Sequence, residues 1–413
     1  MKKKGAPFKP EYSMPPVLLP ALLCVFLLLS PALDAEQFLY KHETGDTYRI
    51  LSTVNEDVYI NRRLSHQAEI LNRIAVEVQE VKEGKGRIKA SFLTAERALA
   101  LAGRSFQWSR EYESEFERDE QGHLTIGRQY YMPVVRDVPV FPSKDIKAGE
   151  SWSAEGHEMH DFRDGFGIQE PYLIPFTAQY TFLGTREWKD KDYPAFSVTY
   201  RIFTEPAAVR GSIYPTRIMG ASDQTVYWDT NMGQAVAYEE NFRMIFELSN
   251  NQTVEYRGWA KAEVLESQRM DREKIKDEIK EELERLDLGG ISVRDSEEGI
   301  VLNLENIQFY PDSPVMLPGE QQKLDKIAEI LMRYGDRDIL VGGHTALAGN
   351  PEGRMKLSLD RAGTVADYLI DKKVRGADRV VVRGYGAEKP IADNLNETGR
   401  ARNRRVEITI LEN

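Results

Sequence analysis

The sequence contains a single cysteine, Cys24, among 413 residues. One cysteine has no partner for an intramolecular disulfide. Cys24 lies inside an apolar run near the N-terminus, and the residue before it is Leu23, where a lipoprotein acceptor site prefers a small residue. We therefore expect Cys24 to be an ordinary residue of this run, and thiol chemistry to play no part in the mature protein.

The apolar run at residues 17–30 is short for a membrane-spanning helix, which needs about 20 apolar residues. Pro20 and Pro31 interrupt and bound it. Four lysines precede the run within the first nine residues, and small residues lead from it to Ala35. A basic start, an apolar middle and a small-residue exit are typical of a secretory signal peptide. We predict a signal peptide at residues 1–35, in preference to a retained membrane anchor.

Positive charge is in deficit, because 55 Lys and Arg stand against 66 Asp and Glu and give a formal net charge of -11. General nucleic-acid binding needs a basic face that neutralises phosphates, so this composition argues against a nucleic-acid partner. We found no phosphate-binding glycine loop followed by a Lys-Ser or Lys-Thr pair. His344 has no evident Ser or Cys nucleophile to serve, and we expect it to brace a loop. The sequence therefore predicts a protein that is not an enzyme and has no cofactor.

Residues 36–266 are typical of an all-β domain. Runs such as TYRILSTV at 47–54 and TVEYRGWAKAEVL at 253–265 are rich in Val, Ile, Thr and aromatic residues and alternate in part. Turn-forming residues separate these runs, for example Asp119 to Gly122. We predict an antiparallel sandwich, barrel or half-barrel, and the sequence does not decide among the three.

Two short motifs in this region resemble pieces of metal sites. The motif GHEMH places His157 and His160 three residues apart, in a segment that we expect to be a loop. The motif DTNMG at residues 229–233 resembles part of a calcium loop but lacks the distant glutamate. We expect ordinary loop polarity for the first, a hairpin turn for the second, and no metal site.

The second half of the chain changes character. Residues 269–286 repeat Ile and Leu at helical spacing among charged residues, which predicts a connecting helix within a linker at 267–290. Residues 291–413 then alternate strand and helix. We predict helices at 318–335 and 358–373 in a β-α-β-α-β-β order, with parallel pairing between strands that a helix joins. The fold class is therefore multidomain, with an all-β domain followed by an α+β domain.

Six segments of residues 291–413 occur in an order that is similar to a known family. The segments are NIQFYPDS, LDKIAEIL, GHT, LSLDRAGTVADYLI, RGYGAEKPIADN and GRARNRRVEI. Together they resemble the OmpA-like peptidoglycan-associated domain. The resemblance implies a non-catalytic domain that holds the stem peptide of peptidoglycan in the periplasm of a diderm bacterium. The β-rich domain would then be tethered to the wall and face an outer-membrane or periplasmic partner; oligomeric state stays open.

The resemblance also implies a binding pocket. In the family, an Asp directly after Gly-His-Thr and an Arg of the next helix hold the charged end of diaminopimelate, and the first Arg of NRR lies close by. In this chain the Asp position is Ala346, and Arg354 replaces an Asn that is common seven residues before the helix arginine. The pocket therefore keeps its cations and lacks its anion. The residues implied as peptidoglycan-binding are Thr345, Ala346, Arg354, Arg361, Asn403 and Arg404.

Arg361 is the central residue of this hypothesis. We expect its helix to open near Ser358, so that Arg361 lies in the first turn, where the helix dipole disfavours a cation by a few tenths of a kcal/mol. The planar guanidinium fits a ligand carboxylate with two hydrogen bonds. We expect Ala346 to change which stem peptide is held and not to abolish wall binding. One candidate ligand is a diamino acid without a distal carboxylate, such as ornithine.

Two other classes of protein are alternatives. An outer-membrane barrel with a wall-binding domain below it is the alternative function. Residues 109–122, SREYESEFERDEQG, argue against it, because they are charged on both faces and a lipid-facing strand is not. A flagellar-stator-like protein also ends in such a domain but keeps a membrane span with an ionisable residue. Residues 17–30 contain no ionisable side chain apart from the Cys24 thiol.

The signal-peptide hypothesis makes a direct prediction. The mature protein is expected to begin close to residue 36 and to remain soluble without detergent, because the apolar run is removed. N-terminal sequencing or intact mass of the protein purified from its native envelope measures this. A protein that starts at Met1 and needs detergent for extraction contradicts the prediction.

Overall fold

The computed structural model describes residues 35–98, 105–166, 168–208, 213–265, 271–296, 298–305 and 307–412. Residues 1–34 of the predicted leader, including Cys24, lie outside the described residues. Within the described residues, no helix has both the length and the apolar character that a membrane crossing requires.

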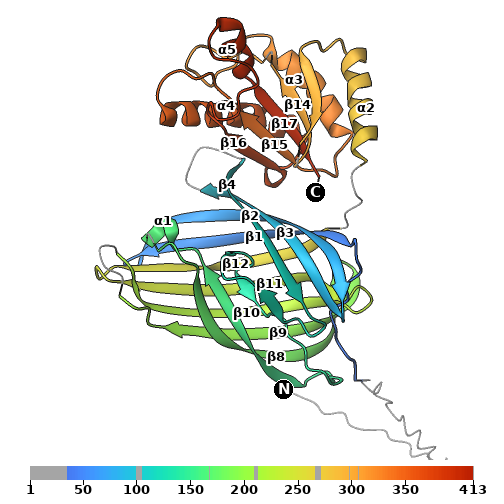
Figure 1. The fold of residues 1–413 in the computed structure, drawn as a ribbon, viewed down its shortest axis with the longest axis vertical. Helices are drawn as coiled ribbons and strands as arrows, with labels where there is room; N and C mark the ends of the chain where they lie inside the picture. The colour runs from blue at the N-terminus through green and yellow to red at the C-terminus, as the bar shows by residue number, and fades with distance from the viewer. Residues whose placement is uncertain are drawn as a thin grey trace, which may run out of the picture. The chain divides into compact units, whose positions relative to one another are not determined.

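The N-terminal region is one antiparallel sheet of long strands, which confirms the predicted all-β domain (Figure 1). Hydrogen-bonded neighbours follow the order β6-β7-β8-β9-β10-β11-β12-β1-β2-β3-β4-β5. The described pairings leave the sheet open between β5 and β6. The elements are β1 (Thr47–Ile60), β2 (Arg63–Lys82), β3 (Lys85–Ala98), β4 (Phe106–Arg118), β5 (Leu124–Ile126), β6 (Val135–Arg136), β7 (Ser151–His160), α1 (Arg163–Phe166), β8 (Tyr172–Trp188), β9 (Lys191–Thr204), β10 (Pro215–Asp229), β11 (Gln234–Leu248) and β12 (Thr253–Leu265).

The inner face of this sheet is packed with aromatic side chains. Along β8, the alternate residues Phe176, Tyr180 and Phe182 are buried, as the period of two of a strand requires. Phe176 stacks on Tyr200 of β9 with ring centroids 3.9 Å apart. The alternation of aromatic and polar residues therefore fixes which face of the sheet turns inward.

The two motifs that resemble metal sites have different outcomes. DTNMG is the predicted hairpin turn: it joins β10 to β11, and Asp229 Oδ1 accepts hydrogen bonds from the backbone N–H groups of Asn231 at 2.8 Å and Met232 at 2.9 Å. The loop expected at GHEMH is wrong. His157 and His160 belong to β7, which pairs with β8 along its whole length, so backbone pairing outweighs the polar composition of the segment.

The C-terminal region has the predicted α+β fold, with additions. Its sheet has the order β13-β14-β17-β15-β16, in which β15 and β16 are parallel and β17 is antiparallel to both β14 and β15. The additions are β13, the short helix η1 and the short helix α5. The parallel pairing predicted across α3 is wrong, because β17 lies between β14 and β15. The elements are α2 (Arg272–Arg285), β13 (Ile291–Asp295), β14 (Gly299–Leu304), α3 (Glu320–Met332), β15 (Ile339–Gly343), α4 (Pro351–Asp371), η1 (Ala377–Arg379), β16 (Val380–Gly384), α5 (Glu397–Asn403) and β17 (Val406–Leu411).

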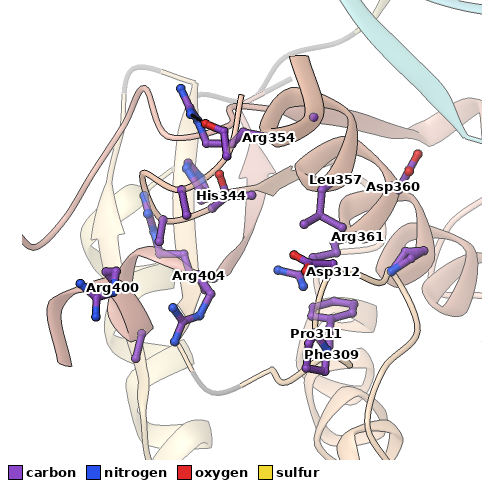
Figure 2. Close-up of a pocket in the computed structure, with 18 of the residues that line it drawn as sticks. Phe309, Pro311, Asp312, His344, Arg354, Leu357, Asp360, Arg361, Arg400 and Arg404 are labelled. Carbon is purple, nitrogen blue, oxygen red and sulfur yellow. Dashed lines mark hydrogen bonds between the residues drawn. The ribbon is translucent and has the colours of Figure 1, made fainter. Parts of the chain in front are cut away.

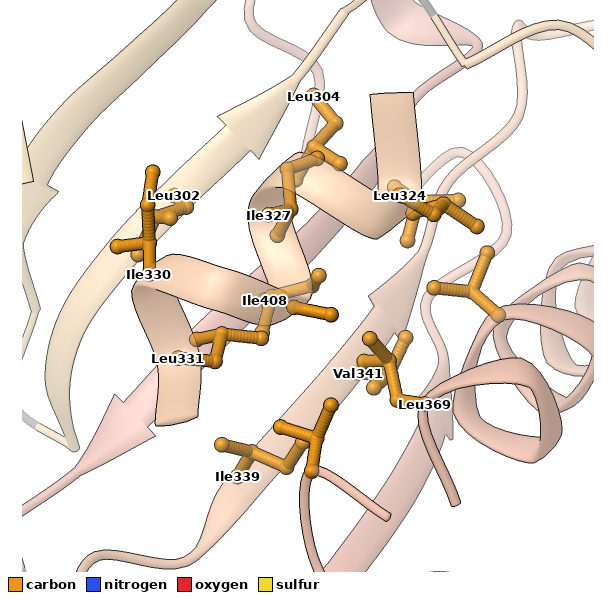
Figure 3. Close-up of a cluster of buried hydrophobic side chains, with 14 of the residues drawn as sticks. Leu302, Leu304, Leu324, Ile327, Ile330, Leu331, Ile339, Val341, Leu369 and Ile408 are labelled. Atoms are coloured by element: carbon orange, nitrogen blue, oxygen red, sulfur yellow. The ribbon is translucent and has the colours of Figure 1, made fainter. Parts of the chain in front are cut away.

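One face of this sheet is covered by helices and forms the core of the region (Figure 3). Leu324, Ile327 and Leu331 recur every three or four residues of α3 and are fully buried against the sheet. Leu302 and Val341, from β14 and β15, are fully buried in the same cluster. Each such side chain contributes about 1.5–3 kcal/mol by leaving water.

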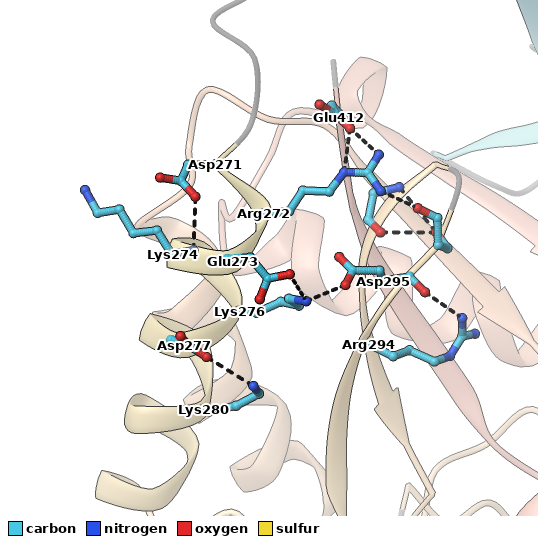
Figure 4. A network of polar contacts seen from close by, with 12 residues as sticks. Asp271, Arg272, Glu273, Lys274, Lys276, Asp277, Lys280, Arg294, Asp295 and Glu412 are labelled. Carbon is cyan, nitrogen blue, oxygen red and sulfur yellow. Dashed lines mark hydrogen bonds and ion pairs between the residues drawn. The ribbon is translucent and has the colours of Figure 1, made fainter.

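The helix predicted at residues 269–286 is present as α2, and it packs on this core. Ile279 is 0% exposed. Polar contacts hold the same helix to the C-terminal sheet (Figure 4): Arg272 Nη1 donates to the Ser296 carbonyl at 2.6 Å, and its guanidinium also pairs with Glu412. Lys276 bridges to Asp295. The domain division at residues 267–290 stays a prediction.

This packing predicts that α2 stabilises the C-terminal region. Ile279→Ala is expected to lower the free energy of unfolding by about 2–5 kcal/mol, the usual cost of truncating a fully buried Ile. The measurement is urea unfolding followed by helical circular dichroism, because the long helices lie in the C-terminal region while all five tryptophans precede residue 266. Lys280→Ala, at an exposed site on the same helix, is the control and is expected to cost less than about 1 kcal/mol. Equal costs for the two variants would contradict a packing role for α2.

Candidate functional site

A close approach of α4 to the sheet builds one wall of the candidate site. A side chain at Gly343 would place its Cβ 1.9 Å from the backbone oxygen of Ser358, so only glycine fits there. Gly384 on the neighbouring strand is crowded in the same way by Met355 and Ser358. Ser358 is fully buried, and its Oγ donates to the Met355 carbonyl at 2.8 Å and accepts from the Gly386 N–H at 2.9 Å. These contacts fix the height of α4 above the ends of β15 and β16.

The helix begins earlier than the sequence led us to expect. α4 starts at Pro351, and Asn350 caps it by accepting a hydrogen bond from the Gly353 N–H at 2.6 Å. Arg361 is therefore in the middle of the helix, and the prediction that it lies in the first turn is wrong. The expected unfavourable interaction of Arg361 with the helix dipole is wrong as well, because that interaction is confined to the terminal turn. An asparagine cap followed by proline is a recognisable signal for a helix start, and the prediction from sequence did not use it.

Arg361 is a buried cation that the protein itself holds in place. It is 8% exposed. Its Nε donates to the Ser313 carbonyl at 3.1 Å and its Nη2 to the Tyr310 carbonyl at 3.4 Å. Its guanidinium carbon lies 5.0 Å from the centre of the Phe309 ring. Burial lowers the pKa of Arg361, and the nearby Asp312 carboxylate opposes this change. The side chain is thus positioned before a ligand arrives.

Arg361 faces a cavity of about 1190 Å³ (Figure 2). On the opposite wall, Arg400 and Arg404 share the carboxylate of Glu397, with an Arg400 Nε to Oε2 distance of 2.9 Å. These two arginines lower the pKa of Glu397. Cations outnumber anions around the cavity. The lining cations are Arg354, Lys356, Arg361, Arg400, Arg402, Arg404 and Arg405, and the lining anions are Glu305, Asp312, Asp360 and Glu397.

The loop after β15 forms the floor of the cavity. Thr345 and Ala346 line it and are 7% and 5% exposed. The Thr345 Oγ is buried and has no hydrogen-bond partner among the described residues. His344 stacks on Tyr385, with ring centroids 4.7 Å apart, and its backbone N–H donates to the Arg405 carbonyl at 3.0 Å. Burial lowers the pKa of His344. These contacts agree with the bracing role expected for His344.

Arg354 contributes a further cation from the first turns of α4. Its Nη1 donates to the Gly349 carbonyl at 2.5 Å, while its Nε is buried without a partner among the described residues. Buried polar atoms in native proteins nearly always have partners, so an orphaned one needs an explanation such as water or a ligand. The unpartnered atoms of Thr345 and Arg354 both belong to residues that line the cavity.

Asn403 differs from the other residues predicted for the site. Its Oδ1 accepts from the N–H groups of Ile391 and Ala392 at 2.9 and 3.0 Å, and its Nδ2 donates to the Ala392 carbonyl at 2.8 Å. It is 1% exposed and is not among the lining residues. Its amide braces the segment before α5. The structure therefore brings Thr345, Ala346, Arg354, Arg361 and Arg404 together around the cavity and places Asn403 behind it.

Sequence reasoning missed three residues of the cavity. Phe309 and Asp312 come from the loop after β14, and Arg400 comes from α5. Both stretches were part of the recognised segments, but no role was assigned to these side chains. Within the described residues, no group of three or more His, Cys, Asp or Glu side chains is placed to hold a metal ion.

The C-terminal region is similar to known proteins. Residues 308–404 match the OmpA family, so the C-terminal region carries an OmpA family domain. The probable lipoprotein YiaD of Escherichia coli K12 is 38% identical over 122 residues, which are 29% of this chain and 55% of that protein. The peptidoglycan-binding protein ArfA of Mycobacterium tuberculosis H37Rv is 36% identical over 104 residues, 25% of this chain and 32% of that one. The chain thus spans about half of the first relative and a third of the second.

A solved structure is also similar over the same part of the chain. The cell wall anchor of the T6SS from Pseudomonas aeruginosa has 31% sequence identity, covers 32% of this chain and 94% of its own, and gives a TM-score of 0.28.

The burial of His344 predicts a pH dependence. Because its folded pKa is lowered, the unfolded state binds more protons below the ordinary pKa of about 6.5. Stability is therefore full above that pH and falls as the pH drops from about 7 toward 5. His344→Asn is expected to flatten this fall in urea unfolding followed by helical circular dichroism. His66→Asn, at an exposed site on β2, is the control. An unchanged slope in His344→Asn would contradict the assignment.

Proposed function

We propose that this protein is a non-catalytic envelope protein that binds peptidoglycan non-covalently through its OmpA domain. The observation that carries the proposal is the cavity at Arg361, where cations exceed anions and buried polar atoms of Thr345 and Arg354 have no partner among the described residues. Stem peptides of peptidoglycan are short and rich in carboxylates. A carboxylate bound to the arginines would offset the excess positive charge.

The energetics suit a binding site. A hydrogen bond to a charged group contributes about 1.5–3 kcal/mol, and an unsatisfied buried polar group costs about 1–3 kcal/mol. Arg361 donates two of its five N–H groups to loop carbonyls, and these hydrogen bonds fix the orientation of its planar guanidinium group. Rigid positioning of this kind reduces the entropy lost on binding. The pocket is therefore organised in advance for an anionic peptide.

We assign the imidazole that lines the cavity a structural role. His344 is the imidazole of the cavity, and within the described residues no hydroxyl or thiol is hydrogen-bonded to it. Its ring packs flat on Tyr385. Its Nε2 lies 3.6 Å from Glu407 Oε2.

The comparisons support the same ligand. One relative is named as a peptidoglycan-binding protein, and one similar structure is described as a cell wall anchor. We extend this to the whole chain as a proposal: the OmpA domain tethers the β-rich region to the wall in the periplasm, where that region faces another envelope component.

The proposal predicts the effect of removing the pocket arginines. Arg361→Ala is expected to weaken binding to purified sacculi by about tenfold to a hundredfold, because it loses a charge-assisted hydrogen bond. Arg404→Ala is expected to weaken binding less, because Arg404 already pairs with Glu397. Co-sedimentation of the purified protein with sacculi measures this. Arg285→Ala, on α2 and away from the cavity, removes the same charge and should bind as the unaltered protein does. Melting curves must show that all three variants fold. Wild-type protein that stays in the supernatant at every sacculus concentration would overturn the proposal.

A further inference from the structure

Apolar side chains form one row across the outer face of the N-terminal sheet. We call it the outer stripe; across β9, β10, β11, β1 and β2 it consists of Phe203, Met219, Ile245, Tyr59 and Leu64. The strand register pairs the first three with each other in that order and the last two with each other. Glu255 of β12 lies between the two groups, because it pairs with Ile245 on one side and with Tyr59 on the other. The strands that carry this row are neighbours in the sheet (Figure 1).

The outer stripe faces water and not the core. Along β9, β10, β11 and β1 its residues stand next to buried residues of the inner face, which are Ile202, Ile218, Phe246 and Val58. Because successive side chains of a strand point to opposite faces, the stripe lies on the outer face. Phe203 is 66% exposed and Leu64 is 52% exposed. Single exposed apolar residues are ordinary, but a contiguous set of them marks an interaction site.

The carboxylates around the outer stripe already have partners within the protein. Glu255 Oε1 lies 2.9 Å from Arg243 Nε and 3.8 Å from Arg257 Nε, and its side chain is only 14% exposed. The other carboxylates within two residues of the stripe are bonded to Arg217, for Glu205 and Glu247, and to Gln67, for Asp57. The negative charge of this surface is therefore compensated.

Three arginines beside the outer stripe are left without an anion. Arg62, Arg63 and Arg201 are exposed, and their side chains have no ion pair or hydrogen bond within the described residues. Arg201 precedes Phe203 by two residues on the same strand, whereas Arg62 and Arg63 lie at the tip of the β1–β2 hairpin, next to Leu64. The uncompensated charge on both sides of the stripe is thus positive, although the whole chain has a net charge of -11.

An apolar row with arginines on both sides has the chemistry of an element that lies flat in a membrane interface. The apolar side chains reach the boundary of the acyl chains, and guanidinium groups beside them bind phosphate with two hydrogen bonds. Tyr59 and Arg257, which lie 3.9 Å apart from ring centre to guanidinium carbon, are residue types that anchor proteins at this depth. A protein partner would need an apolar ridge with acids along both of its sides, whereas a bilayer with anionic headgroups presents that layering at every point.

We propose that the outer stripe docks the β-rich region on the surface of a membrane that carries anionic phospholipid headgroups. Phe203 and Leu64 supply the apolar contact, and Arg62, Arg63 and Arg201 bind the phosphates. This inference goes beyond the proposed function and does not depend on it, because the arginine cavity of the OmpA domain takes no part in the docking.

Co-sedimentation with vesicles tests the docking. The mature protein is expected to bind vesicles of equal parts phosphatidylcholine and phosphatidylglycerol, and to bind phosphatidylcholine vesicles at least about tenfold more weakly. An arginine near an anionic surface contributes about 1 kcal/mol, so Arg62→Asn combined with Arg63→Gln should weaken binding to the mixed vesicles about thirtyfold. Asparagine suits residue 62, where φ is 65°. Phe203→Ser should weaken binding about tenfold, because less apolar area leaves water.

A fluorescent label reports insertion directly. Residues 36–413 contain no cysteine, so an introduced one is a unique labelling site in the mature protein. A polarity-sensitive dye on Phe203→Cys is expected to shift its emission to shorter wavelength when the mixed vesicles are added. The same dye on Met232→Cys should not respond, because this residue is 50% exposed but lies in the β10–β11 turn, at the opposite end of β10.

The matched control for charge is Lys82→Gln combined with Lys85→Gln. It removes two exposed cations from the hairpin at the opposite end of β2 and should bind vesicles as the unaltered protein does. The inference is wrong if the mature protein stays in the supernatant with mixed vesicles, if this control loses as much affinity as the arginine variant, or if the dye at residue 203 keeps its aqueous emission. Purified sacculi contain no bilayer, so failure to bind them would overturn the proposed function and leave this inference standing.

Discussion

The close approach of Ser358 to Gly343 and Gly384 is the constraint on which the pocket depends. Two glycines at the ends of neighbouring parallel strands let the α4 backbone come nearer than any side chain would allow. The buried Ser358 hydroxyl then bonds both to its own helix and to the loop after β16. Arg361 lies three residues further along, so the height and rotation of the helix at Ser358 decide where its guanidinium is placed. A bulkier residue at either glycine would move the whole wall.

A second feature is the way in which buried charge is made tolerable. Burial opposes the charged form of Arg361, and the loop carbonyls of Tyr310 and Ser313 compensate by accepting its hydrogen bonds. On the facing wall the charges are partly exposed, and Arg400 and Arg404 share the carboxylate of Glu397. Each cation is therefore stabilised by groups of the protein itself and keeps further N–H donors. A site assembled only when ligand binds would have to spend binding energy on this ordering.

Much of the fold was predictable because its periodicities are strong. The apolar spacing in α2 and α3 and the β-branched runs in β1 and β12 gave elements of the right type in the right place. Segments whose composition disagrees with their structure were the failures. The strand β7 contains GHEMH, which was predicted as a loop. The helix α5 lies in an arginine-rich stretch for which no helix was predicted. The first turns of α4 contain Gly353 and no apolar stripe, so the helix seemed to start later.

The site was only partly predictable for a related reason. Thr345, Ala346, Arg354, Arg361 and Arg404 could be placed by family resemblance, because the motif fixes their order. Asp312 could not, since nothing in its local sequence shows that the loop after β14 folds back across α4. Asn403 was predicted to line the site and does not. The sequence gives no sign that its side-chain amide is hydrogen-bonded to backbone groups. Contacts between segments far apart in the chain decide both cases.

The carboxylate of Glu397 has a consequence for how long a ligand stays. Glu397 already forms ion pairs with Arg400 and Arg404. A ligand carboxylate on that wall must replace these ion pairs, so the net gain in binding free energy is smaller than that of a new ion pair. Glu397 competes with the ligand for both arginines, and this competition shortens the lifetime of the complex. Under the proposed function, residence on the wall is then brief and rebinding is frequent. A chain that holds a polymer in this way can change its attachment point without cutting a bond as the mesh is enlarged around it.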